Sequence, residues 1–318
     1  MRSLTLTAAF LASLAGPAFA EFDAALDRHV LPRMDALAEA TQTLARAECD
    51  PAVLRPAFAG AAQAWAGVAH LTLGPAEVEG RARAILFWPD ERDATGRGLR
   101  LLTQQGAEAW TPEALARASV AARGLGALER LIWEDDAEPC ALTLALADDL
   151  AATAGAIRDE WRGGFADLMR DPGGPGNTRF LAPDEVNRAL FTALLAGLER
   201  IADQDLGHPL GTFEGPRPRQ AALYRSEMSL PMIRTALAAL RELAATLAEA
   251  PRTDAALARA VEEAEALDDP SLAGVEDPMG RFRVEALQST VRDARAIAAE
   301  EIGAALGVGT GFNSADGD

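Results

Sequence analysis

Residues 21–46 read EFDAALDRHVLPRMDALAEATQTLAR, and the spacing of their apolar side chains decides the fold class. Apolar residues recur every three to four positions, which places them on one face of a helix. This face comprises Phe22, Leu26, Val30, Met34, Leu37 and Leu44. Pro32 lies inside the stretch. Because proline has no amide hydrogen, we expect it to kink the helix or to shift its start.

The same helical period continues along the chain. Asp50 followed by Pro51 is typical of a helix start. We expect that helix to end at Gly74-Pro75. Its buried stripe is predicted to be Val53, Phe58, Ala61, Trp65 and Val68. Further helices are predicted at about 91–105, from Thr111 toward Trp133, and at 139–162, 183–204, 218–249, 253–267 and 280–306, with Pro231 bending or splitting the helix over 218–249.

No stretch of six residues alternates between apolar and polar side chains as a strand would, so the sequence predicts an all-α protein. The clearest break is the segment 171–177, which reads DPGGPGN. We therefore expect an N-terminal helical half over 21–170 and a C-terminal helical half over 178–308, followed by a tail over 309–318. Two halves of similar size suggest an internal duplication, although no strong repeat of residues is visible.

Residues 1–20 resemble a cleavable signal peptide. Arg2 supplies the positive charge, an apolar run follows, and Ala18-Phe19-Ala20 fits the cleavage rule. The rival interpretation, a membrane anchor, requires a longer apolar stretch than this one, which is interrupted by Gly16 and Pro17. We therefore expect export to the periplasm or cell envelope, and no membrane span in the mature chain.

The charge balance excludes several classes of partner and reaction. The net charge of −18 repels nucleic acid and anionic lipid. The sequence contains no lysine, which removes Schiff-base chemistry and the phosphate-binding loop that depends on lysine. Cys49 and Cys140 are the two cysteines, and in an oxidising compartment such a pair usually forms a disulfide.

Ordinary catalytic motifs are absent, and only three histidines are present, so a metal site rich in histidine is excluded within one chain. Several segments nevertheless depart from simple helix packing. They are HLTLGP at 70–75, FWPD at 87–90, GLGALERLIWE at 124–134, LYRSEMSL at 223–230 and GTGFNSADGD at 309–318.

In their order and spacing these segments resemble the imelysin family of iron-regulated and insulin-cleaving-peptidase-like proteins. The segment 124–134 resembles the family motif G-x-H-x-x-E, with Gly124 and Glu129 at the glycine and glutamate, and Gly126 at the position of the histidine. The resemblance implies two pseudo-symmetric helical-bundle halves with a polar site at their junction. It also implies an association with iron regulation and uptake, and a peptidase activity has been attributed to the family.

From these segments we predict a ligand-binding site formed by His70, Arg81, Asp90, Glu129, Arg225 and Ser226, and we assign no catalytic residue. His70, Asp90 and Glu129 are the candidate metal ligands, for iron or another divalent or trivalent cation. Simpler interpretations remain open: a hydrogen-bonded His70, an ion pair of Glu129 with Arg81 or Arg225, a helix-capping Asp90, and close packing at Gly124 and Gly126.

Three functions follow from this sequence. The first is a periplasmic ligand- or metal-binding accessory protein in iron acquisition, with iron-uptake components of the envelope as its expected partners. The second is a metal-dependent peptidase, which the loss of the motif histidine at Gly126 disfavours because a catalytic zinc needs about three protein ligands. The third is a structural or partner-binding helical protein without a small ligand.

Overall fold

The computed structural model describes residues 20–90, 92–134 and 140–308. All named elements among these residues are helical, and the one β feature is an isolated bridge between Thr212 and Gly215. The prediction of an all-α protein is therefore confirmed. The predicted signal peptide, apart from Ala20, and the predicted tail 309–318 lie outside the described residues.

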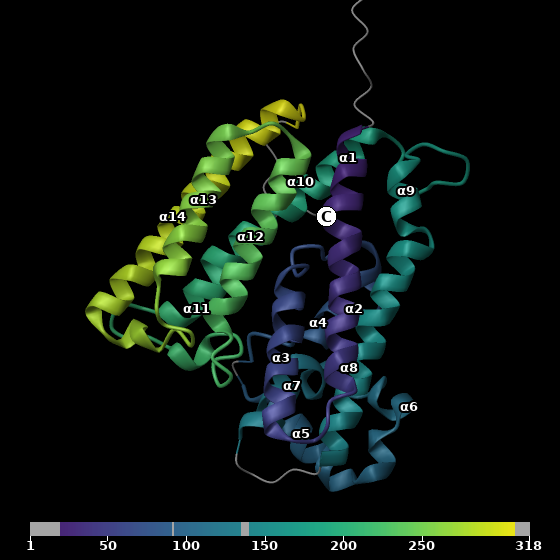
Figure 1. Ribbon diagram of the computed structural model, residues 1–318, viewed down its shortest axis with the longest axis vertical. Helices are drawn as coiled ribbons and strands as arrows, with labels where there is room; N and C mark the ends of the chain where they lie inside the picture. Colours follow the sequence, from purple (N-terminus) through teal and green to yellow (C-terminus); the bar gives the residue numbers. More distant parts are fainter. Residues whose placement is uncertain (1–19, 91, 135–139, 309–318) are drawn as a thin grey trace, which may run out of the picture.

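The helices form two groups that stand side by side (Figure 1). The first group comprises α1 (Ala20–Ala25), α2 (Leu31–Ala45), α3 (Pro51–Ala66), α4 (Arg81–Ile85), α5 (Ala94–Gln105), α6 (Pro112–Leu115), α7 (Gly124–Trp133), α8 (Cys140–Glu160) and α9 (Ala166–Arg170). The second comprises α10 (Pro183–Glu199), α11 (Gly207–Leu210), α12 (Ser229–Leu247), α13 (Pro251–Ala266) and α14 (Pro278–Ala305). Helices α2, α3, α7 and α8 pack on one another in the first group, and α10, α12, α13 and α14 do so in the second.

Pro32 lies in the first turn of α2 and shifts the start of that helix, as the sequence predicts. Because Pro32 cannot donate a backbone hydrogen bond, the preceding turn, Leu26–Val30, widens into a π-helix that continues from α1. His29 and Val30 of this turn are buried. Two further π-helical turns follow other helices: Trp161–Phe165 follows α8, and Arg200–Leu206 follows α10 in the other group.

The predicted start of α3 is confirmed, because the Asp50 carboxylate accepts a hydrogen bond from the amide of Ala52. Four members of the predicted buried stripe, Phe58, Ala61, Trp65 and Val68, are buried as predicted. Val53 is the exception at 41% exposed, and Leu54 takes its place, because 54 and 58 are four residues apart and share the inner face. The helix also ends at Ala66, before the Gly74-Pro75 break that the sequence indicates.

Two predicted helices are shorter than expected. The helix expected from Thr111 to Trp133 is divided into α6, which ends at Leu115, and α7, which begins at Gly124 with a positive φ of 68°; a 3-10 turn at Val120–Ala122 lies between them. The helix expected over 218–249 begins only at Ser229. Pro231 therefore lies in the first turn of α12 and neither bends nor splits this helix. The residues 221–228 before it form an irregular segment with positive φ at Leu223 and Glu227.

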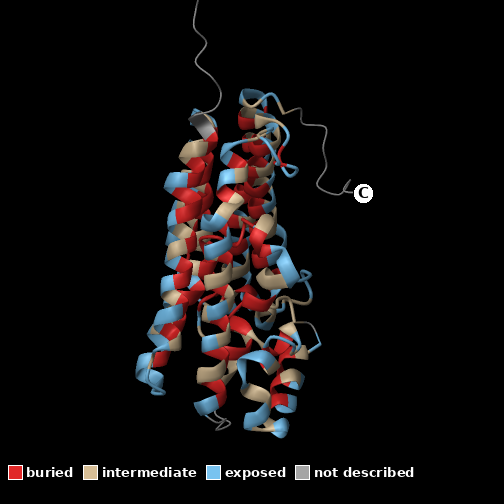
Figure 2. Ribbon diagram, turned by 90° about the vertical axis from the view of Figure 1, so that its right-hand side faces the viewer, coloured by how far each residue is buried: buried red, intermediate tan, exposed pale blue. Residues whose placement is uncertain are grey.

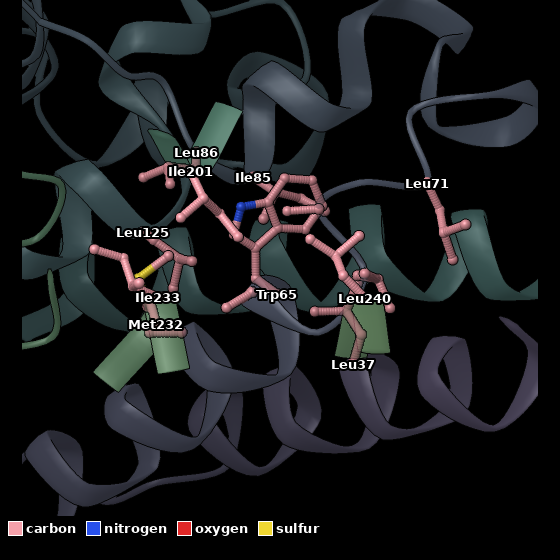
Figure 3. Packing of buried hydrophobic residues seen from close by; sticks show 14 of the residues in the cluster. Leu37, Trp65, Leu71, Ile85, Leu86, Leu125, Ile201, Met232, Ile233 and Leu240 are labelled. Atoms are coloured by element: carbon pink, nitrogen blue, oxygen red, sulfur yellow. The ribbon is translucent and has the colours of Figure 1, made fainter. Parts of the chain in front are cut away.

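One hydrophobic core runs through both groups. The helices turn their buried faces inward and their exposed faces outward along the whole length of the molecule (Figure 2). Around Trp65 of α3, residues of the first group such as Leu37 and Leu125 meet Ile201 and Ile233 of the second (Figure 3). The two groups are therefore packed as one body, and their pseudo-symmetry remains a prediction.

A disulfide joins Cys49, between α2 and α3, to Cys140 at the start of α8, with a Cα–Cα distance of 6.1 Å. The predicted pairing is confirmed. By length and composition alone, the stretch Cys140–Arg170 could cross a membrane, although a core helix can meet the same criteria. In this fold it packs against α2 and α7, with Leu146 and Leu150 buried.

Candidate functional site

A pocket of about 150 Å³ lies where the two groups of helices meet. One wall comes from the first group, from residues 86–90, which follow α4, and from 126–130 in α7. The other wall comes from residues 219–225, which include the end of the 3-10 turn Pro218–Gln220 and the first part of the irregular segment 221–228 before α12. Four of the six predicted site residues gather here, because Asp90, Glu129 and Arg225 line the pocket and Ser226 binds Glu129.

Glu129 of α7 is the most deeply buried charged group of the pocket, with 3% of its surface exposed. Its Oε1 accepts hydrogen bonds from the amide of Ser226 at 2.9 Å and from the Ser226 hydroxyl at 2.7 Å. Its Oε2 lies 3.8 Å from Nη1 of Arg225. Burial raises the pKa of Glu129, and the hydrogen bonds from Ser226 and the charge of Arg225 oppose that rise.

Three arginines contribute positive charge to this pocket, and they differ in their partners. Arg225 stacks on the Tyr224 ring at 4.5 Å and forms an ion pair through Nε with Glu134 at 2.6 Å. Arg130 pairs with Asp93 at 2.6 Å. Arg219 is exposed and has neither a hydrogen bond nor an ion pair within the described part of the chain. Its guanidinium is therefore available to a ligand.

Asp90 lines the pocket, but its carboxylate is hydrogen-bonded to backbone amides at the start of α5. Its two oxygens accept from the amides of Ala94 at 2.6 Å and Thr95 at 2.9 Å. Burial acts to raise the pKa of Asp90, but these hydrogen bonds and the charge of Arg130 outweigh it and leave the pKa below its ordinary value. The capping interpretation of Asp90 is the one that the geometry supports.

Two glycines at the start of α7 have different reasons to be glycine. Gly124 has a φ of 68°, and a Cβ there would collide with the backbone oxygens of Ala84 and Ile85. At Gly126 a Cβ would meet only the carbonyl oxygen of Phe87, at an ordinary 3.7 Å. Close packing therefore explains Gly124, whereas Gly126 has no such steric reason and instead leaves space in the pocket.

His70 lies outside the pocket and forms a buried pair with His29. Their Nε2 atoms are 2.9 Å apart, and Arg33 donates through Nε to Nδ1 of His29. That donation fixes the tautomers: His29 carries its proton on Nε2 and gives it to Nε2 of His70. Desolvation lowers the pKa of His29 to about 3 and that of His70 well below its ordinary value, and the charge of Arg33 adds to both effects.

Sequence reasoning missed this histidine pair, because His29 lies 41 residues from His70 and is turned inward by the π-helical turn. It also missed Asp205, which is buried in the π-helical turn Arg200–Leu206 with Oδ2 at 3.6 Å from Nε of Arg200. A charged or titratable residue at an apolar position of a helical stripe was the available signal in both cases.

Arg81 also lies away from the pocket. Its guanidinium pairs with Glu160 at 2.8 Å and lines a groove of about 580 Å³ on the first group of helices. Of the two ion pairs predicted as alternatives for Glu129, the one with Arg225 is present at 3.8 Å, whereas Arg81 pairs with Glu160 instead.

The donor atoms of the pocket do not suit a resident metal ion. No group of three or more His, Cys, Asp or Glu side chains within 20–90, 92–134 and 140–308 could hold one. Of the three candidate ligands, His70 faces His29, and Asp90 is occupied by backbone amides. Only Glu129 remains, beside the cation Arg225, and a single carboxylate does not form a metal site.

Two solved structures share this fold. An imelysin-like protein from Psychrobacter arcticum 273-4 superposes with a TM-score of 0.75 at 21% sequence identity, covering 91% of this chain and 95% of that one. A structure described as an iron-regulated protein A precursor from Parabacteroides distasonis ATCC 8503 gives a TM-score of 0.66 at 13% identity, covering 90% and 96%. At these identities the likeness concerns the fold alone.

A comparison with curated proteins finds no match. The sequence model of the family described as Imelysin, peptidase M75, matches residues 24–298. This range includes both groups of helices, the pocket between them and the segments that carried the resemblance, apart from the C-terminal tail. The chain therefore belongs to the imelysin family.

Proposed function

We propose that this chain is an exported binding protein that holds a small polar ligand in the junction pocket, and that it serves as an accessory protein in iron acquisition. One observation carries the binding proposal: Arg219, which has no partner within the described part of the chain, faces the same pocket as the buried Glu129. A concave site with a few converging polar groups is the usual form of a small-molecule site.

Two facts support the wider role without testing it. The sequence of residues 1–20 fits a secretory signal, which supports export. A protein of the same fold is described as an iron-regulated protein precursor, which supports the link to iron. The cell envelope is accordingly the proposed location, and iron-uptake components of the envelope are the proposed partners.

The pocket favours binding over metal-dependent peptide cleavage. A metallopeptidase needs about three protein ligands and a metal-activated water. Here Glu129 is held by Ser226, and Asp90 is held by backbone amides. No specific contact among the described residues favours the peptidase alternative.

The test is a thermal-shift screen of the chain without residues 1–20. Its probes are small carboxylates, amino acids, sugars, inorganic phosphate, ferric citrate and the chlorides of iron, zinc and copper. A ligand at a hundredfold excess over its Kd stabilises a protein by about 2.7 kcal/mol, which is a measurable rise in Tm. We expect one class of probe to raise Tm.

The variant Gly126→Leu identifies the site, because residue 126 lines the pocket and a Cβ there meets only the Phe87 carbonyl oxygen, at an ordinary 3.7 Å. Gly155→Leu is the matched control, since Gly155 is also a helix-interior glycine, a Cβ added there would have no atom within 4 Å, and it lies outside the pocket. The shift should vanish in the first variant and persist in the second. A shift that survives Gly126→Leu, or no shift with any probe, contradicts the binding proposal.

Elemental analysis tests the iron link separately. The protein is purified, incubated with ferric citrate, desalted and analysed for iron, and its Tm with ferric citrate is compared with its Tm in citrate alone. Iron retained in proportion to the chain, or a shift specific to ferric citrate, supports the link. A protein that retains no iron and does not respond to ferric citrate leaves the binding site but removes direct iron binding from the proposal.

A further inference from the structure

The groups that line the junction pocket define the chemistry of a ligand. Among the lining residues, the guanidinium groups of Arg130, Arg219 and Arg225 outnumber the carboxylates of Asp90 and Glu129 by one. The pairing of Arg130 with Asp93 and of Arg225 with Glu134 offsets two of these positive charges. Arg219 is left as the lining guanidinium without an ion pair among the described residues. Anions are attracted to such a site, and guanidinium groups bind carboxylates in a planar, two-pronged geometry.

Not all of these charges are free to bind. Arg130 is held by Asp93, and Asp90 by the amides of Ala94 and Thr95. Arg225 lines the pocket and pairs through Nε with Glu134, whereas its terminal N–H groups form no hydrogen bond among the described residues, Nη1 lying 3.8 Å from Glu129. The available cationic donors are therefore the guanidinium of Arg219 and the terminal N–H groups of Arg225.

Glu129 supplies an acceptor at the buried end of the same pocket. Its Oε1 takes both donors of Ser226, whereas Oε2 lies 3.8 Å from Arg225 Nη1, longer than a hydrogen bond. A carboxylate offers about four acceptor positions, so Oε2 retains capacity for a donor. A ligand that gives Glu129 a hydrogen bond satisfies a buried polar group at little desolvation cost.

The volume limits the size of the ligand. The pocket measures about 150 Å³, and an apolar cavity of about that volume in another protein holds one benzene molecule. The space at Gly126 is part of this volume, because any larger side chain there would occupy it. A ligand of about six non-hydrogen atoms therefore fits, and one of a dozen or more does not fit inside.

We propose that the junction pocket binds a small 2-hydroxycarboxylate, with its carboxylate between Arg219 and Arg225 and its hydroxyl donating to Glu129. This inference rests on the proposed function and gives its site a ligand class. A hydroxyl serves better than an ammonium group as the donor, because the cation Arg225 already lies beside Glu129 and a second cation would be repelled there.

The experiment is isothermal titration calorimetry of the chain without residues 1–20, with L-lactate, propionate, L-alanine and inorganic phosphate as probes. Lactate and propionate differ only in the hydroxyl group. We expect lactate to bind and propionate to bind at least about tenfold more weakly, the usual effect of losing one hydrogen bond to a charged group. Alanine and phosphate should bind more weakly than lactate.

Variants assign the two ends of the ligand. Arg219→Gln should weaken lactate and propionate by the same factor, about tenfold, because it acts on the shared carboxylate. Arg217→Gln is the control and should change neither affinity. Arg217 lies two residues before Arg219, is also exposed and has no ion pair among the described residues. Glu129→Gln should reduce the preference for lactate over propionate; circular dichroism and Tm establish that this variant folds.

Equal affinities for lactate and propionate overturn the assignment of the hydroxyl to Glu129. Tighter binding of phosphate or alanine than of lactate overturns the ligand class, as does the absence of binding by all four probes. In each of these cases the proposed function survives if another compound produces a Tm shift that Gly126→Leu removes and Gly155→Leu retains. If no compound does so, both proposals fail.

Discussion

His29 and His70 meet through their Nε2 atoms at 2.9 Å in the buried interface between the two groups of helices. Arg33 holds the outer nitrogen of His29, and Arg33 in turn pairs with Glu242 of α12 at 2.6 Å. On the other side, Gly197 of α10 lies against the Cβ of His70 so closely that a side chain at 197 would collide with it. The neutral histidine pair of the first group is therefore part of the packing contact with α10 and α12 of the second group.

This pair should make the protein less stable as the pH falls. Folding lowers the pKa of His29 from 6.5 to about 3, so between these values the unfolded chain binds the proton and the folded chain does not. The free energy of unfolding therefore falls as pH decreases, by up to about 1.4 kcal/mol per pH unit for His29. The pKa of His70 is shifted in the same direction and adds to this loss.

Chemical denaturation at pH 7, 6 and 5 measures the slope, and His29→Gln should reduce it. Glu242 and Arg33 face His29, and Arg200 adds positive charge near His70. Burial raises the pKa of both Glu129 and Asp205, and a carboxylate with a raised pKa stabilises the folded state as pH falls, opposite to the histidines. A slope that is identical in His29→Gln would show that the histidine pair does not set the pH dependence.

The two glycines of α7 should respond to alanine in opposite ways. Gly124→Ala places a Cβ against the carbonyl oxygens of Ala84 and Ile85 at a positive φ, so we expect a loss of several kcal/mol in unfolding free energy. Gly126→Ala meets only ordinary contact and gains about 0.5–1 kcal/mol from helix propensity. Thermal unfolding of both variants distinguishes them, and a large loss at Gly126 would show that packing alone requires that glycine.

The disulfide should contribute measurably to stability. Cys49 and Cys140 are separated by 91 residues, and the chain-entropy model gives at most about 4–5 kcal/mol for closing such a loop. Measured effects are usually smaller, about 2–4 kcal/mol. The double variant Cys49→Ser with Cys140→Ser should unfold at correspondingly lower denaturant concentration. Treatment of the unchanged protein with a reductant should reproduce that shift, and the double variant should not respond to it.

The sequence was sufficient for most of the architecture, because apolar period and helix-start residues are local signals. Asp50 with Pro51 begins α3, and Pro32 shifts α2, as their chemistry requires. Errors arose where tertiary contacts decide. Nothing local shows that Gly124 passes against the backbone of Ala84, or that α6 ends as early as Leu115.

The residues of the candidate site also divide into those that the sequence located and those that only the tertiary structure shows. Family motifs located Glu129, Arg225 and Ser226, which the fold brings together across nearly a hundred residues. They did not separate His70 from this group, because its partner, His29, is turned inward by a π-helical turn that has no sequence signature of its own. Arg219 was also missed, since an exposed arginine in an irregular segment gives no signal until the opposing wall of the pocket is known.

The link between Glu129 and Ser226 should couple the two groups energetically. Ser226→Ala removes the 2.7 Å hydrogen bond to a buried carboxylate and should cost about 1.5–3 kcal/mol of unfolding free energy, the range for hydrogen bonds to charged groups. In a Glu129→Gln background the same substitution loses only a neutral hydrogen bond and should cost about 0.5–1.5 kcal/mol. The difference is the coupling energy of a double-mutant cycle, measured by chemical denaturation of the four proteins.

Ser229→Ala is the matched control, because the Ser229 hydroxyl donates to the carbonyl of Ala222 rather than to a carboxylate. Its cost in unfolding free energy should be the same in both backgrounds. Equal costs for Ser226→Ala in the two backgrounds would mean that the charge of Glu129 contributes nothing through the hydroxyl contact, and the carboxylate would then be held by the backbone amide of Ser226 and by Arg225.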